Sequence, residues 1–172
     1  AVHVESTGDA TEARLLRAIR KLRPELPQDQ PLEPTLRRVV DTAAADGRPK
    51  VLFVLDQFEQ WLHVHRADAE PELVRALRVC DGSHLQCLLV VRPEFQVYIS
   101  RLAAQLPGVW RPNLKMSLVE LFDQPHARHV LAEFGRSYDV PRKDAESWET
   151  FLQQAVAALA DEDGRVVAVR LA

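Results

Sequence analysis

The chain has little cysteine, little glycine, no long apolar run and no surplus of positive charge. Its two cysteines cannot build a disulfide framework, which argues against a small secreted domain held by disulfides. No segment approaches the roughly 18 continuous apolar residues of a membrane-spanning helix, and no signal peptide is recognisable. We therefore expect a cytoplasmic protein with no membrane span in this segment.

The same scarcities argue against nucleic-acid and metal-binding classes. The formal net charge is -3, so no basic surplus is available to neutralise nucleic-acid phosphates. Cys80 and Cys87 have no second cysteine pair with which to hold zinc, and His126 and His129 lack an acidic third ligand at a suitable spacing. The sequence therefore predicts neither nucleic-acid binding nor a structural metal site.

What is present has the composition of a globular domain, with 47% hydrophobic and 27% charged residues. Strand-like segments at 2–4, 50–55 and 85–91 alternate with segments of helical periodicity. A weaker strand is predicted at 113–121. This order is typical of an α/β fold in which helices flank a parallel sheet. We expect the strands at 50–55 and 85–91 to be buried on both faces.

Helix boundaries can also be predicted. Asp9 and Asp123 are placed to cap helices, and Gly47 is placed to end one. After residue 121 the sequence predicts helices only. Two apolar helical faces are predicted there, one at Val130, Leu131, Phe134 and Tyr138, the other at Trp148, Phe151, Leu152, Ala155, Val156 and Leu159.

Charged side chains follow the two strong strands. Asp56, Gln57 and Glu59 come after the first, in "VLFVLDQFEQWL", and Arg92 comes after the second. Ligands of open parallel sheets bind beyond the carboxyl ends of the strands. An acid there can hold Mg²⁺, and an arginine can contact a terminal phosphate. The alternative is that these residues are solvated strand ends or halves of structural ion pairs.

The segment "VLFVLDQFEQWL" (51–62), together with "CLLVVRPEF" (87–95), resembles the STAND NTPases, specifically the group called novel STAND NTPases, type 1. These are P-loop ATPases related to AAA+ proteins. The later segment "VELFDQPHARHVLAEFG" (119–135) is similar to the family's passage from the last core strand into a helical lid. The resemblance implies a partial P-loop NTPase core of the ASCE type at 1–121 and the start of a helical lid subdomain at 122–172.

The resemblance also implies site roles and partners. Asp56 would be the Walker B acid associated with Mg²⁺, and Arg92 would be the sensor 1 residue that contacts the terminal phosphate of ATP. Glu59 or Gln57 would activate the attacking water. The module would act as an ATP-dependent switch in a larger bacterial signalling protein, attached to effector or repeat domains. The resemblance is also compatible with nucleotide-dependent self-association.

One element of such a site is missing from the sequence. The P-loop pattern G-x-x-x-x-G-K-[ST] does not occur in these residues. In the family it lies upstream, and the apolar ends "AVHVES" and "GRVVAVRLA" fit a chain cut from a longer polypeptide. The strand bearing the P-loop would lie between the strand near Leu88 and the one near Met116. We expect the isolated chain to hydrolyse ATP poorly. The alternative is a non-catalytic regulatory or protein-interaction module with the NTPase fold.

Overall fold

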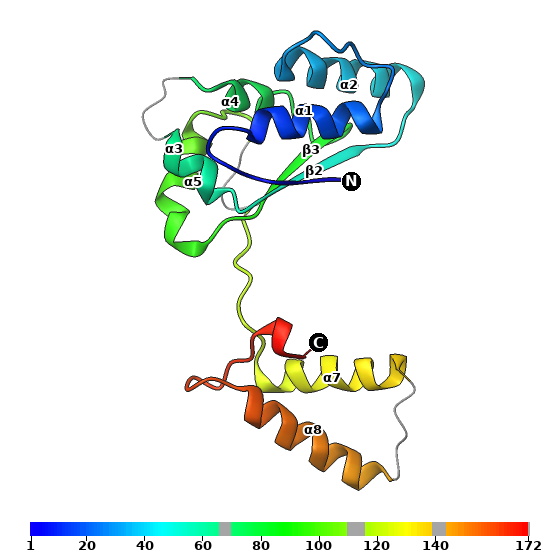
Figure 1. Ribbon diagram of the computed structural model, residues 1–172, viewed down its shortest axis with the longest axis vertical. Coiled ribbons are helices and arrows are strands. Elements are labelled where there is room, and N and C mark those ends of the chain that lie inside the picture. The colour runs from blue at the N-terminus through cyan, green and yellow to red at the C-terminus, as the bar shows by residue number, and fades with distance from the viewer. Residues whose placement is uncertain (66–69, 110–115, 139–143, 172) are drawn as a thin grey trace. The chain divides into compact units, whose positions relative to one another are not determined.

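The computed structural model describes residues 1–65, 70–109, 116–138 and 144–171, and the chain divides into two compact units, Ala1–Met116 and Ser117–Ala172 (Figure 1). No helix among the described residues has both the length and the apolar composition to cross a membrane. The first unit has an α/β fold and the second is helical. Each unit is considered by itself.

The first unit is built on a three-stranded parallel sheet. Its strands are β1 (Val2–Glu5), β2 (Val51–Asp56) and β3 (Leu85–Leu89), in the order β1-β2-β3. The register pairs Glu5 with Asp56 and Leu55 with Leu89, so all three strands end at the same edge of the sheet. The parallel sheet predicted from the sequence is thus confirmed, with the most apolar strand in the middle.

Helices flank this sheet and share one hydrophobic core with it. They are α1 (Thr11–Leu22), α2 (Leu32–Asp46), α3 (Glu59–Val64), α4 (Glu72–Leu77) and α5 (Gln96–Ala104), the last preceded by a 3-10 turn η1 (Pro93–Phe95). Helix α1 packs against β1 and α2, and α2 packs against α4 (Figure 1). The fully buried side chains at the centre are Leu15, Ile19, Leu36, Phe53, Leu55, Leu73 and Leu85.

The prediction that the strand at 85–91 is buried on both faces was wrong. Gln86 and Leu88 on β3, and Val90 just after it, are exposed, with Leu88 at 49%. Only the alternate residues Leu85, Cys87 and Leu89 pack against the core. The reason is positional, because β3 is an edge strand of the described sheet and one of its faces carries no described cover.

The predicted strand at 113–121 was also wrong where it can be examined. Residues 113–115 lie outside the described residues, and residues 116–121 form no strand. Leu118 and Val119 are 66% and 89% exposed. A strand needs a partner to satisfy its backbone groups, and an apolar sequence alone does not supply one.

Helix ends follow the sequence signals in two cases out of three. Gly47 ends α2 in the left-handed conformation, with φ of 62°, and the Asp123 side chain accepts a hydrogen bond from the backbone N–H of His126. Asp9 does not cap α1. The N-cap is Ala10, whose N–H donates to Thr7 Oγ1, while Thr11 Oγ1 accepts from the N–H of Thr7.

The second unit consists of α7 (Gln124–Ser137), α8 (Ala145–Leu159) and a 3-10 turn η2 (Ala168–Leu171). Its small core contains Ala127, Val156, Val166 and Leu171. The predicted apolar faces are only partly buried. Phe134, Tyr138 and Phe151 are 38%, 80% and 52% exposed, because two helices joined by loops offer too little surface to cover every aromatic ring.

Candidate functional site

The carboxyl edge of the sheet brings together the residues that the sequence singles out. Strand β2 ends at Asp56, and the Ser6 N–H that follows β1 donates to the Asp56 carbonyl oxygen at 2.8 Å. On the other side, the Val90 N–H donates to the carbonyl oxygen of Leu55 at 2.9 Å. Arg92 follows immediately. Asp56 and Arg92 therefore lie at the same edge of one sheet, as expected of residues that follow two parallel strands.

A strained turn connects β2 to the residues beyond it. Gln57 has a φ of 50° and is the one described non-glycine residue with positive φ. Its own N–H donates to Asp56 Oδ1, and its side-chain Nε2 donates to Oε1 of Glu5 at 3.2 Å. Gln57 itself is exposed, but the turn directs the next two residues, Phe58 and Glu59, into the interior. Strain of this kind is often found next to functional residues.

Glu59 is a buried acid with an incomplete set of partners. The residue is 5% exposed. Its Oε1 accepts a hydrogen bond from Arg92 Nε at 3.2 Å, whereas Oε2 is buried and has no hydrogen-bond partner in the described part of the chain. A buried carboxylate with one unsatisfied oxygen is costly, by about 1–3 kcal/mol. Such an atom points to a water, a cation or a ligand group as its missing partner.

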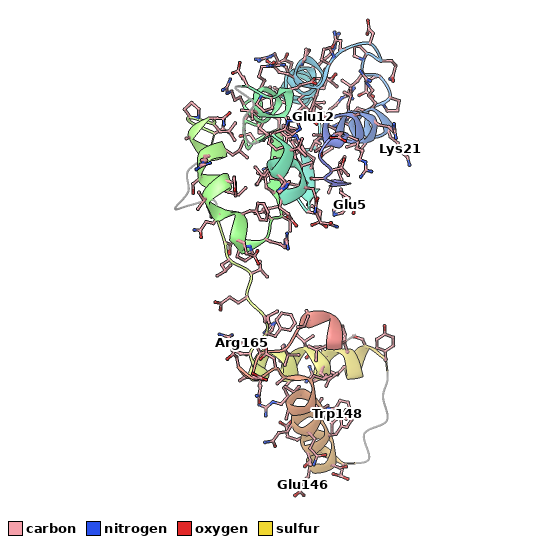
Figure 2. The ribbon with its side chains drawn as sticks, turned by 60° about the vertical axis from the view of Figure 1, so that its left-hand side comes forward. Glu5, Glu12, Lys21, Glu146, Trp148 and Arg165 are labelled. Carbon is pink, nitrogen blue, oxygen red and sulfur yellow. The ribbon has the colours of Figure 1, made fainter. Side chains whose placement is uncertain are left out.

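An aromatic stack fixes the position of Glu59. The rings of Phe58 and Trp61 stack with centroids 5.3 Å apart, and His65 stacks on Trp61 at 4.5 Å. The indole Nε1 of Trp61 donates to Glu12 Oε1 at 2.9 Å, which ties α3 to α1. Figure 2 shows Glu12 in this unit, together with Glu5 from the end of β1. Glu59 begins a helix whose next turn is anchored in the core, so its side chain has little freedom to swing away.

Arg92 and Asp56 are more open to solvent than Glu59. The Arg92 side chain is 62% exposed, and its guanidinium lies 5.6 Å from the centre of the Phe95 ring. Among the described residues, Glu59 is the polar partner of that guanidinium. The Asp56 side chain is 37% exposed, and its Oδ2 lies 3.4 Å from His3 Nε2. The site is therefore an open edge with one buried acid, rather than an enclosed cavity.

The described residues contain no cluster of three or more histidine, cysteine, aspartate or glutamate side chains able to hold a metal ion. A cation at Asp56 would therefore depend on water and on ligand oxygens for most of its coordination, which is the usual condition of Mg²⁺ beside phosphates. Cys87 is not a nucleophile candidate, because burial and the nearby Cys80 raise the pKa of its thiol well above the usual range.

Two residues of this edge were not found from the sequence. His3 and Glu5 occupy alternate positions on β1, and both contact the end of β2 through Asp56 and Gln57. The signal was present, since polar residues alternate with the buried Val2 and Val4. Their relevance depends on β1 pairing with β2, which a single sequence does not reveal.

No family model matches the chain, and the curated proteins and solved structures contain no significant match to it. The resemblance to the STAND ATPases therefore rests on the sequence segments described above. The geometry of the edge stands independently of it.

Proposed function

We propose that this chain is the Walker B and sensor 1 part of a STAND-type ATPase switch module. The observation that carries the proposal is the meeting of Asp56, Glu59 and Arg92 at the carboxyl edge of one parallel sheet. An acid, a second acid and an arginine at that edge suit phosphoryl transfer, in which catalysis is mostly positioning and neutralisation of charge.

Each residue has a role that fits its environment. Asp56 is accessible and carries a carboxylate of the type that holds Mg²⁺ through water. Glu59 is buried and has one oxygen without a protein partner, so it is the better candidate to activate water than the exposed and neutral Gln57. Arg92 has a side chain that is 62% exposed, so its guanidinium can contact a terminal phosphate.

The phosphate cradle must come from residues outside this sequence, which contains no G-x-x-x-x-G-K-[ST] pattern. We propose that the strand bearing it pairs with the outer edge of β3. This proposal is supported by the position of β3 at the edge of the described sheet and by the exposure of Leu88 and Val90. The helical second unit would then be the start of the lid.

The test uses the intact polypeptide in which these residues occur, with ATP binding and hydrolysis measured separately. We expect Asp56→Ala to weaken MgATP binding about tenfold or more as well as turnover, because the cation loses the carboxylate that holds it through water. We expect Glu59→Gln to leave binding intact and to lower kcat by about 10²–10⁴-fold. Asp41→Ala, which removes an exposed carboxylate of α2, is the matched control.

The outcomes separate this function from the alternative. If ATP binding is absent, or if it is indifferent to both Asp56→Ala and Glu59→Gln, the non-catalytic interaction module becomes the better description. If Glu59→Gln alone leaves turnover unchanged, the water-activating role passes to Gln57. For residues 1–172 in isolation we expect little hydrolysis. Strong hydrolysis by this chain that Asp56→Ala abolishes would contradict the need for an external phosphate cradle.

A further inference from the structure

We propose that Arg92 is a positioning residue for Glu59 and that an anion binding to Arg92 releases this acid. The inference deepens the proposed function and rests on it. It starts from the unequal burial of the pair: the Glu59 side chain is 7% exposed and the Arg92 side chain is 62% exposed. One partner is therefore fixed in the protein, while the other can be reached from solvent.

The contact that joins the pair is a weak form of the arginine–carboxylate interaction. Only Arg92 Nε donates, and it does so at 3.2 Å to a single oxygen of Glu59. The strongest arginine–carboxylate pairs use two parallel N–H donors at about 2.7–2.9 Å. The Nη groups of Arg92 have no partner among the described residues, so the guanidinium retains donors that a phosphate could accept.

A phosphate would compete with Glu59 for the same cation. When the guanidinium turns to a phosphate, the pairing with Oε1 is weakened, and Oε2 has no described partner to compensate. Glu59 then becomes a buried carboxylate without a counter-ion, which strongly favours the binding of a water or a cation beside it. Occupation of Arg92 by phosphate and availability of Glu59 are therefore coupled.

The coupling is reciprocal. If phosphate weakens the Glu59–Arg92 pair, then the pair must weaken phosphate binding by the same factor. Removing the negative charge of Glu59 should therefore make Arg92 a better anion site. If Arg92 serves only to neutralise Glu59, the expected result differs. Removal of the Glu59 charge would then change the stability of the protein but not the affinity of Arg92 for anions.

The experiment is a titration of residues 1–172 with inorganic phosphate at constant ionic strength, followed by NMR of the Arg92 Nε–H group and the Glu59 side-chain carboxyl carbon. In the unmodified chain we expect both signals to shift with one common midpoint. Glu59→Gln should lower the phosphate dissociation constant at Arg92 about fivefold. Arg92→Gln should abolish the phosphate response of Glu59.

Arg101→Gln is the matched control. Arg101 lies over the Tyr98 ring at 5.7 Å, as Arg92 lies over Phe95 at 5.6 Å, but it belongs to α5 and has no described contact with Glu59. Its removal should leave both phosphate-dependent shifts unchanged. The titration of the unmodified chain decides the question even if Glu59→Gln does not fold, because the shared midpoint needs no variant.

Two results would overturn the inference. If phosphate shifts the Arg92 signal but not that of Glu59, the two events are independent, and the proposed function is unaffected. If neither signal responds to phosphate, Arg92 is not an anion site, and its role as a phosphate sensor fails together with the coupling. The proposed function can also fail alone. In that case the two signals would shift together in this titration, but Asp56→Ala would have no effect on ATP binding in the intact polypeptide.

Discussion

At the scale of single residues, the end of β2 is held in an unfavourable conformation by its surroundings. A left-handed φ costs a non-glycine residue about 1 kcal/mol or more, since Cβ approaches the backbone too closely. Gln57 adopts such a φ while its side chain makes one exposed hydrogen bond to Glu5. Because that hydrogen bond is exposed to solvent, it stabilises the turn too little to offset the cost of the conformation. The turn persists because the residues after it, Phe58 and Glu59, are fixed in the interior.

We therefore expect Gln57→Gly to stabilise the first unit, raising its free energy of unfolding by about 0.5–1 kcal/mol. Urea unfolding monitored by far-UV circular dichroism measures the change.

Gly47→Ala tests the opposite change, from glycine to a residue with a Cβ. Gly47 has a similar φ of 62° and open space around the position of a Cβ, so the substitution tests the backbone conformation alone. It should lower the free energy of unfolding by about 1 kcal/mol. A loss of stability in Gln57→Gly would show that its side chain, and not the conformation, matters.

Residue-scale features were predictable where the signal is local. The roles of Gly47 and Asp123 as helix-ending and helix-capping residues depend on the few residues next to them. The failure at Asp9 has the same origin, because Thr7 and Thr11 form a competing local arrangement. The sequence also identified Asp56, Glu59 and Arg92, since each follows a strong strand. Their pairing could not be predicted, because the left-handed turn at Gln57 decides which acid enters the core.

At the scale of single elements, β3 depends on the turn that precedes it. One oxygen of Asp81 accepts hydrogen bonds from the N–H groups of Ser83, His84 and Leu85, and the other lies 2.7 Å from the His84 ring. Burial alone would raise the pKa of Asp81. The N–H of Leu85, the His84 ring and the two further N–H groups outweigh burial and hold the pKa of Asp81 well below its usual range.

This turn makes part of the protein's stability pH-dependent. Since the pKa of Asp81 is lower in the folded than in the unfolded chain, ionised Asp81 contributes its full stability above the unfolded value of about 3.9, and loses it as the pH falls toward the folded value. We expect Asp81→Asn to be less stable than the unmodified chain at pH 7, and the difference to narrow below about pH 4. Asp81→Ala should lose about 1–2 kcal/mol at pH 7. Urea unfolding from pH 7 to pH 3 checks both.

The control for this pH series is Asp41→Asn, an exposed aspartate of α2. Its difference in free energy of unfolding from the unmodified chain should stay flat over the same range. A difference for Asp81→Asn that does not change with pH would mean that the negative charge of Asp81 contributes nothing to the stability of the turn.

The packing of α7 on α8 depends on a glycine. A Cβ at Gly135 would lie 2.6 Å from Cζ2 of Trp148, which projects from α8 (Figure 2). Gly135→Ala gains about 1 kcal/mol of helix propensity. The ring must move to admit the methyl group, at a cost of about 1–3 kcal/mol. We therefore expect a net loss of up to about 2 kcal/mol in the second unit.

Fluorescence reports the movement of the ring directly. The Trp148 contribution, isolated as the difference from Trp148→Phe, should shift in Gly135→Ala. As a control, Ser137→Ala changes an exposed residue of the same helix and removes a hydroxyl that donates to the Glu133 carbonyl oxygen. An unshifted Trp148 signal together with increased stability would show that the ring yields without cost, so that the glycine is not required for packing.

At the scale of the whole molecule, the fold class was predictable because it follows from the alternation of strands and helices. The sequence also predicted the apolar strand β2, although its place between β1 and β3 is seen only in the structure. What it could not predict is where cover is incomplete. Leu88 and Phe151 carry the same apolar signal as buried residues, and their exposure depends on which partner elements are present. Hydrophobic periodicity indicates which face is to be covered, but not what covers it.

The open edge of β3 gives the last prediction. In a parallel pair, alternate residues direct both backbone groups toward the neighbouring strand. The His84 carbonyl and the Val90 N–H both bond to β2, so Gln86 and Leu88 face β2 as well. The backbone N–H and carbonyl groups of Leu85, Cys87 and Leu89 point away from β2, toward the open edge. The turn satisfies Leu85, because its N–H donates to Asp81 and its carbonyl accepts from Gly82. Cys87 and Leu89 are left with outward N–H groups that pair with no described residue.

We therefore expect the amides of Cys87 and Leu89 to exchange with deuterium about 10²-fold or more faster than those of Gln86 and Leu88, although all four belong to one strand. Amide-resolved NMR in residues 1–172 measures this, and the central strand supplies the control, because β2 pairs with β1 on one side and with β3 on the other. A dilution series distinguishes an open edge from one covered by a second copy, since protection that disappears on dilution comes from association.

Equal protection of all four amides at every concentration would mean that the edge is already paired, and would remove the place proposed for a strand carrying the P-loop. If the proposed P-loop strand of a longer polypeptide pairs with β3, the amides of Cys87 and Leu89 should exchange slowly in that polypeptide, because the added strand would accept their hydrogen bonds.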